Sequence, residues 1–117
     1  SIVLWSVGNE IPDQKEPDGH LILKAMTKVV SQEDPTRPVT AGLDNIAADG
    51  GSTTLEFMNG LDIVGYNYAD RWHERRELVY SMDKHNHPQW KMIGTESVFS
   101  VTCKRSHDVY LPLFFAA

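Results

Sequence analysis

Several features that mark particular classes of protein are scarce or missing in this sequence. Cys103 is the single cysteine among 117 residues, which excludes an internal disulfide and a cysteine-rich zinc site. The longest apolar stretches are too short to cross a bilayer, and no segment combines the basic start and small-residue cleavage site of a signal peptide. These absences leave the cellular compartment open.

Positive charge is also scarce. Eleven basic residues stand against sixteen acidic ones, for a net charge of -5, and no basic stripe is available to neutralise phosphates. The glycines of segment 48–51 lack the strand, glycine and helix order of dinucleotide sites, and His85 and His87 have no third metal ligand nearby. We therefore expect no nucleic-acid partner, no membrane partner, no metal and no cofactor.

What the sequence does contain is an alternation of short apolar runs with helical patterns. The runs that predict strands are residues 2–10, 39–43, 61–68 and 92–96. Apolar side chains at spacings of three and four predict a helix over 21–30, and Asp70 is a suitable N-cap for another over 71–84. A shorter helix is predicted over 53–58, closed by a left-handed cap at Asn59-Gly60.

This regular order predicts an α/β fold with a parallel sheet, because strand-helix crossovers join parallel neighbours. The two candidate architectures are a (β/α) barrel and an open sheet. A complete eight-unit barrel needs about 250 residues, so this chain would hold about half of one. Its first and fourth strands would then be unpaired edges, and we expect the isolated chain to be poorly soluble.

The polar residues with chemical potential follow the strands rather than precede them. Asn9 and Glu10 end the first apolar run, and Glu96 ends the fourth. Each acid alone is more typical of a solvated surface carboxylate. In parallel barrels, however, catalytic residues stand at the carboxyl ends of different strands, and a pair of carboxylates there is the machinery of glycosidic bond cleavage.

Segment 5–12, which reads Trp-Ser-Val-Gly-Asn-Glu-Ile-Pro, closely resembles the general acid/base motif of glycoside hydrolase family 2. Segments 34–40 and 61–68 are similar to the family's barrel strands five and six, and 93–97 to its strand-seven nucleophile segment. The sequence after Ser97 departs from the family pattern. The resemblance implies that residues 1–117 are a fragment of a single catalytic domain, a partial TIM (β/α)8 barrel comprising about strands four to seven.

The resemblance also implies roles for five residues. Glu10 would be the general acid/base and Glu96 the nucleophile. Asn9 would donate from its amide to the sugar 2-hydroxyl. Tyr68 would hydrogen-bond the nucleophile, and Tyr66 is the alternative, because it is expected on the same strand face.

The implied activity is that of a retaining exo-β-glycosidase that hydrolyses terminal β-glycosides, with β-galactosides favoured. A β-glucuronidase or β-mannosidase of the same family is an alternative, and so is a non-catalytic carbohydrate-binding relative. The implied partners are the carbohydrate substrate, the remaining barrel strands and accessory β-sandwich domains of a longer chain. The isolated chain would be inactive, because half of its pocket would be missing.

Overall fold

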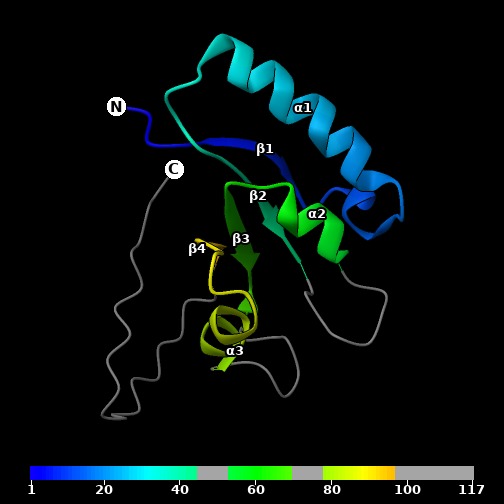
Figure 1. Cartoon of the computed structure of the whole chain (residues 1–117), viewed down its shortest axis with the longest axis vertical. Coiled ribbons are helices and arrows are strands. Elements are labelled where there is room, and N and C mark those ends of the chain that lie inside the picture. Colours follow the sequence, from blue (N-terminus) through cyan, green and yellow to red (C-terminus); the bar gives the residue numbers. More distant parts are fainter. Residues whose placement is uncertain (45–52, 70–77, 97–117) are drawn as a thin grey trace.

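A computed structural model describes residues 1–44, 53–69 and 78–96, and within them four strands form one sheet (Figure 1). The strands are β1 (Trp5–Asn9), β2 (Val39–Leu43), β3 (Ile63–Asn67) and β4 (Met92–Glu96). They lie in the order β1-β2-β3-β4, and each neighbouring pair is parallel. The predicted α/β class with a parallel sheet is confirmed.

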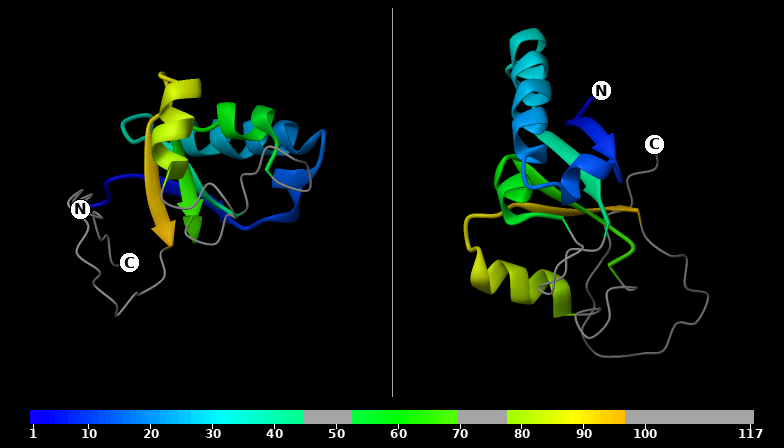
Figure 2. Two further views of the ribbon diagram at one scale, coloured as in Figure 1. Left: turned by 90° about the horizontal axis from the view of Figure 1, so that it is seen from below. Right: turned by 90° about the vertical axis from the view of Figure 1, so that its right-hand side faces the viewer.

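The connections between the strands contain the helices. These are the 3-10 helix η1 (Pro12–Lys15) and the α-helices α1 (Gly19–Glu33), α2 (Leu55–Asn59) and α3 (Val79–Asn86). Figure 2 shows α1 and α2 on the same side of the sheet. In the part of the chain that the structure describes, no helix is long and apolar enough to cross a membrane.

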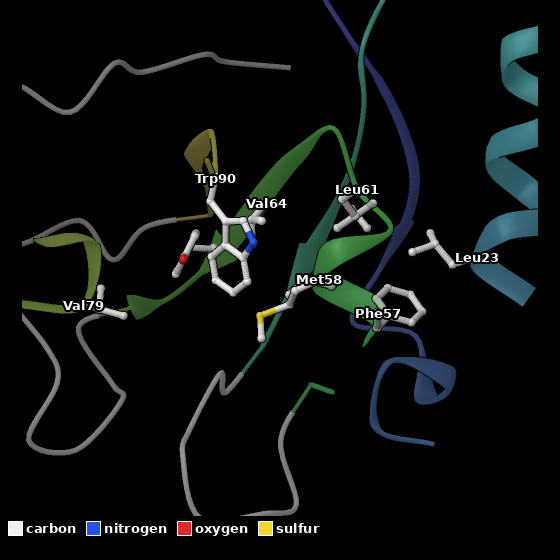
Figure 3. Close-up of a cluster of buried hydrophobic side chains, with 10 residues drawn as sticks. Leu23, Phe57, Met58, Leu61, Val64, Val79 and Trp90 are labelled. Carbon is white, nitrogen blue, oxygen red and sulfur yellow. The ribbon is translucent and has the colours of Figure 1, made fainter. Parts of the chain in front are cut away.

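The core lies between the helices and one face of the sheet. Alternate residues of a strand point to the same face, so Ala41 and Leu43 of β2 join Val64 and Tyr66 of β3 on the helix side. The helices and loops add further buried side chains, several of which are labelled in Figure 3: Leu23, Phe57, Met58, Leu61, Val79 and Trp90. The opposite face of the sheet is therefore free to carry polar groups.

Both tryptophans that the structure describes donate a hydrogen bond from the indole N–H, and Trp90 also belongs to the core. Trp90 is 6% exposed, and its indole N–H donates to Asn59 Oδ1 at 2.9 Å. The indole of Trp5 donates to Asp34 Oδ2 at 3.0 Å. Bonds from the Thr36 hydroxyl above all, and also from Trp5 and Arg37, hold the pKa of the Asp34 carboxyl well below its usual range.

The strand bounds agree closely with the sequence prediction over 39–43 and 92–96, while the other two strands are shorter than predicted. Helix α1 extends beyond 21–30 at both ends. The predicted N-cap Asp70 and the first part of the predicted helix 71–84 lie outside the described residues, as does Cys103. The part that is described continues to Asn86, two residues further than predicted.

The predicted left-handed cap at Gly60 is wrong, since Gly60 has φ -79° and ψ -8°. Its N–H donates to the carbonyl oxygen of Phe57, which closes the helix with a right-handed turn. Glycine is needed there for space instead, because an added Cβ would stand 2.8 Å from Leu23 Cδ2 of α1. The residue thus permits the close approach of α1 to α2.

Candidate active site at the carboxyl edge of the sheet

The predicted site residues stand where the parallel strands end. Glu10 follows β1, and its backbone N–H donates to Gly42 O of β2 at 2.8 Å. Tyr68 follows β3, and its N–H donates to Glu96 O of β4 at 2.8 Å. The structure therefore brings Asn9, Glu10, Tyr68 and Glu96 to the same edge of the sheet.

The backbone is bent at two of these strand ends. Glu10 has φ 49° and Tyr68 has φ 50°, both in the left-handed region, and no other non-glycine residue does so in the part of the chain described here. Such a conformation costs on the order of 1 to 2 kcal/mol for a residue with a Cβ. The pairing register also shifts, between Ser6 and Asn9 on β1 and between Tyr66 and Asn67 on β3. Irregularities of this kind re-aim side chains and are frequent beside active sites.

Asn67, the last residue of β3, links the strand ends through its side chain. Its Nδ2 donates to Asn9 Oδ1 at 2.9 Å and to Glu10 Oε1 at 3.1 Å. Its Oδ1 accepts from the Thr95 hydroxyl at 2.5 Å. With Asn67 itself 0% exposed, the side chain forms a buried polar bridge from β1 to β4.

Sequence reasoning did not assign Asn67 or Thr95 to the site. The sequence carried no clear signal for Asn67, because Ile63 and Val64 put large apolar residues on both faces of the third run and alternation does not single out a polar face. No signal marked Thr95 as the partner of Asn67 either, since their contact joins two strands separated by a helix.

Gly42 of β2 lies beneath this bridge. A Cβ added there would stand 2.4 Å from Asn9 Oδ1 and 2.9 Å from Asn67 Oδ1. Both distances are too short for unbonded atoms, so any larger residue at this position would displace the amides. Because Gly42 has no side chain, the amides of Asn9 and Asn67 have room above β2.

Tyr66 lies apart from this group. Its side chain is 0% exposed, and its hydroxyl donates to Asp83 Oδ2 of α3 at 2.9 Å. The ring packs 4.9 Å, centroid to centroid, from that of Tyr80 on the same helix. The expectation that Tyr66 and Tyr68 share a strand face does not hold, because regular alternation ends at Asn67 and Tyr68 has left the extended conformation.

A third acid, Asp44, follows β2 and is engaged by donors from η1. Gln14 Nε2 donates to Asp44 Oδ1 at 2.6 Å, and Lys15 Nζ lies 3.4 Å from Oδ2. The Thr53 hydroxyl donates to Gln14 Oε1 at 3.1 Å and completes a local network. Asp44 therefore holds η1 against the end of β2.

Glu10 is exposed and Glu96 half-buried at the same edge.

The described residues contain no group of three or more His, Cys, Asp or Glu side chains that could hold a metal ion. The same edge carries the carboxylic acids Glu10 and Glu96, the bonded amide and hydroxyl groups of Asn9, Asn67 and Thr95, and the residue Tyr68. This donor set suits acid-base and nucleophilic chemistry on a neutral polar substrate.

Comparison with solved structures places the chain among glycoside hydrolases. A crystal structure of a glycosyl hydrolase family 2 member from Bacteroides cellulosilyticus DSM 14838 superimposes with a TM-score of 0.67 and 35% identity, covering 83% of this chain and 12% of that one. A second crystal structure of a family 2 member from Bacteroides cellulosilyticus gives a TM-score of 0.65 and 33% identity over 81% of this chain and 11% of that one.

Comparison of sequences agrees. Beta-galactosidase BoGH2A of Bacteroides ovatus is 28% identical over 61% of this chain and 12% of its own length. The chain thus spans about an eighth of the relatives it matches. The family profile described as "Glycosyl hydrolases family 2, TIM barrel domain" matches residues 1–107. The chain therefore belongs to glycoside hydrolase family 2 and represents part of its TIM barrel domain.

Proposed function

We propose that the protein carrying this chain is a retaining exo-β-glycosidase, in which Glu96 is the nucleophile and Glu10 the general acid/base. The observation that supports this most directly is the hydrogen-bonded edge on which Glu10, Asn67 and the end of β4 meet. Asn67 donates to Glu10 Oε1, and Asn67 and Glu96 are register partners on neighbouring strands. Two carboxyls that act on one bond have to stand at a common edge of this kind.

The reaction would proceed by double displacement. Glu96 attacks the anomeric carbon while Glu10 delivers a proton to the leaving oxygen, which forms a glycosyl-enzyme ester and releases the aglycone. Glu10 then removes a proton from water, the water oxygen attacks the anomeric carbon, and the Glu96 carboxylate is released. Retention requires carboxyl groups about 5 to 5.5 Å apart.

Two further residues would assist these steps. The Asn9 amide would donate to the sugar 2-hydroxyl, an interaction that strengthens in the transition state. The Tyr68 phenol would hydrogen-bond Glu96 and keep its carboxylate in line for attack. The Tyr68 backbone is bonded to the Glu96 carbonyl, which supports this role. Tyr66 is not included, since its hydroxyl is bonded to Asp83 of α3.

The substrates we favour are β-galactosides, because one relative bears the name beta-galactosidase. β-Glucuronides and β-mannosides are the alternatives within the same mechanism. An enzyme distinguishes sugars that differ in the orientation of one hydroxyl through a small number of polar contacts with that group. A panel of aryl β-glycosides, compared by kcat/KM, decides among the three sugars.

We further propose that residues 1–117 are one fragment of a single catalytic barrel, completed by other strands and accompanied by accessory β-sandwich domains. Within the described residues the sheet has four strands, and its edge strands β1 and β4 are only partly buried, whereas β2 is buried throughout. Helix α1 also exposes 58% of Leu21 and 59% of Val29. The chain by itself is then expected to be inactive. Soluble, active protein made from residues 1–117 alone would contradict this proposal.

The carboxylate assignments are tested in the complete protein. Glu96→Ala should abolish hydrolysis of aryl β-glycosides, and added azide should restore turnover to a glycosyl azide of inverted configuration, because azide replaces the missing nucleophile. Glu10→Ala should retain kcat/KM on dinitrophenyl glycosides, whose leaving group needs no proton, and lose it on methyl glycosides. Glu33→Ala, an exposed glutamate of α1, is the matched control.

Normal activity in Glu96→Ala or Glu10→Ala would remove the corresponding assignment. A non-catalytic carbohydrate-binding relative is the other class of function to be considered. It is favoured if the wild-type protein binds sugar and none of the aryl glycosides is cleaved.

A further inference from the structure

The strongest unassigned feature of the edge is the hydrogen-bonded chain from Thr95 through Asn67 to Asn9 and Glu10. An asparagine side chain has two N–H donors and one carbonyl oxygen. Asn67 directs its Nδ2 to Asn9 Oδ1 and Glu10 Oε1, and its oxygen accepts from Thr95. The Asn67 side chain is fully buried, and both of its N–H donors and its oxygen have hydrogen-bond partners.

This arrangement sets the orientation of the Asn67 amide. A 180° flip would point the Asn67 oxygen at two acceptor oxygens and its NH2 group at the Thr95 hydroxyl. The flipped state would lose both bonds to β1, and an unpaired buried polar group costs about 1 to 3 kcal/mol. The Thr95 hydroxyl can donate or accept, so the acceptors Asn9 Oδ1 and Glu10 Oε1 select the orientation, while the bond from Thr95 to Oδ1 tethers the Asn67 side chain to β4.

The orientation of Asn67 in turn decides which atoms its partners present. With Asn9 Oδ1 accepting from Asn67, the Nδ2 end of Asn9 remains as a donor for a ligand. With Glu10 Oε1 accepting, Oε2 remains as the oxygen that carries the transferable proton. Both partners are exposed at the edge, so without this bridge their side chains would sample several rotamers.

We propose that Asn67, tethered to β4 by Thr95, is a positioning residue that fixes the rotamers of Asn9 and Glu10 for proton delivery and for recognition of the sugar 2-hydroxyl. This inference rests on the proposed function, since it presupposes that Glu10 is the acid. It adds a role for two residues that need not touch the substrate: Asn67 as the group that bonds Asn9 and Glu10, and Thr95 as its anchor on β4.

Asn67→Leu in the complete protein is the principal test, because leucine nearly preserves the volume and removes the donors. Misplacement of a catalytic group by about 1 Å costs on the order of 100-fold. We expect kcat/KM for methyl and other alkyl β-glycosides to fall by about that factor. The loss on dinitrophenyl glycosides should be only a small part of it, because those substrates need no proton. A general structural defect would lower both alike.

Three accompanying variants test the role of the Thr95 hydroxyl and the dependence of the effect on Glu10. Thr95→Val should produce the same leaving-group dependence in weaker form, and Thr95→Ser, which keeps the hydroxyl, should rescue it. In a Glu10→Gln background, Asn67→Leu should add no further dependence on the leaving group, because residues that act as a unit are not additive. The ratio of kcat/KM for a glycoside to that for its 2-deoxy analogue should fall in Asn67→Leu, reporting the loss of the Asn9 orientation.

The outcomes separate the inference from the proposed function. If Glu10→Gln has no leaving-group dependence, the acid assignment fails and the positioning role fails with it. If Glu10→Gln shows that dependence while Asn67→Leu loses activity equally on all aglycones or not at all, only the positioning role is overturned. Should Asn67→Leu not fold, Thr95→Val against Thr95→Ser decides by the same criterion.

Discussion

Substitution of Gly42 by alanine probes the arrangement of the two asparagine amides with a single methyl group. The new Cβ would be placed 2.4 Å from Asn9 Oδ1 and 2.9 Å from Asn67 Oδ1. To restore an ordinary contact of 3.4 Å, the first oxygen has to move by about 1 Å and the second by about 0.5 Å. Asn67 is held by β4 through Thr95, so Asn9 takes most of the displacement.

The expected loss follows from that displacement. If Asn9 binds the reacting sugar as proposed, a shift of about 1 Å lowers kcat/KM on the order of 100-fold, which corresponds to about 2.7 kcal/mol of activation free energy. Stability should fall less, toward the lower end of the roughly 1 to 3 kcal/mol typical of overpacking, because Asn9 is exposed and its side chain can yield.

The assay is kcat/KM on an aryl β-galactoside, measured together with thermal unfolding followed by circular dichroism. Gly8→Ala is the matched control in the neighbouring strand. The three heavy atoms nearest to its Cβ would all be side-chain atoms of Ile11, the nearest at 3.1 Å, so activity should stay within about 3-fold of wild type. Wild-type kcat/KM in Gly42→Ala would refute the proposal that the amides above β2 orient the substrate.

Three further outcomes are expected in the complete protein. Gly65→Ala should lower the unfolding temperature more than Gly42→Ala, because its Cβ would stand 2.2 Å from the backbone oxygen of Ala41, which cannot rotate away. Tyr66→Phe should lower the unfolding free energy by about 1 to 3 kcal/mol through the lost bond to Asp83, with kcat/KM unchanged, and a selective loss of activity would return Tyr66 to the site. Asp34→Asn should be less stable than wild type at neutral pH. Since the folded-state pKa of Asp34 is depressed, this contribution is present above the ordinary aspartate pKa of about 3.9 and is lost as pH falls through the folded value, so the two unfolding temperatures should converge in acid.

The fold class and the edge on which the site lies were predictable from local patterns. Short apolar runs separated by helical spacings predict parallel strands, and parallel strands present their carboxyl ends at one edge. Residues that follow such runs, like Asn9, Glu10 and Glu96, therefore reach that edge in any right-handed β/α arrangement. The family assignment came from the same segments, and the profile match over residues 1–107 confirmed it.

Other features depend on contacts between segments distant in the sequence, and for these the local patterns gave a wrong prediction or none. Asn59-Gly60 has the composition of a left-handed cap, yet the backbone of Gly60 is in the right-handed region. Its lack of a side chain makes room for Leu23 of α1. Tyr66 and Tyr68 are two residues apart, which implies a shared face only while the strand remains extended. The left-handed backbone of Tyr68 ends that regularity.

The sequence by itself determined which residue types stand at the strand ends and hence the class of chemistry available, because those properties follow from nearest-neighbour order along the chain. Only the tertiary structure decided that Asn67 bonds to Glu10, that Thr95 bonds to Asn67 from the neighbouring strand, and that Gly42 leaves room for the amides. The physical reason is that these relations are set by the register between strands and by backbone bends at their ends, which bring together groups separated by whole helices.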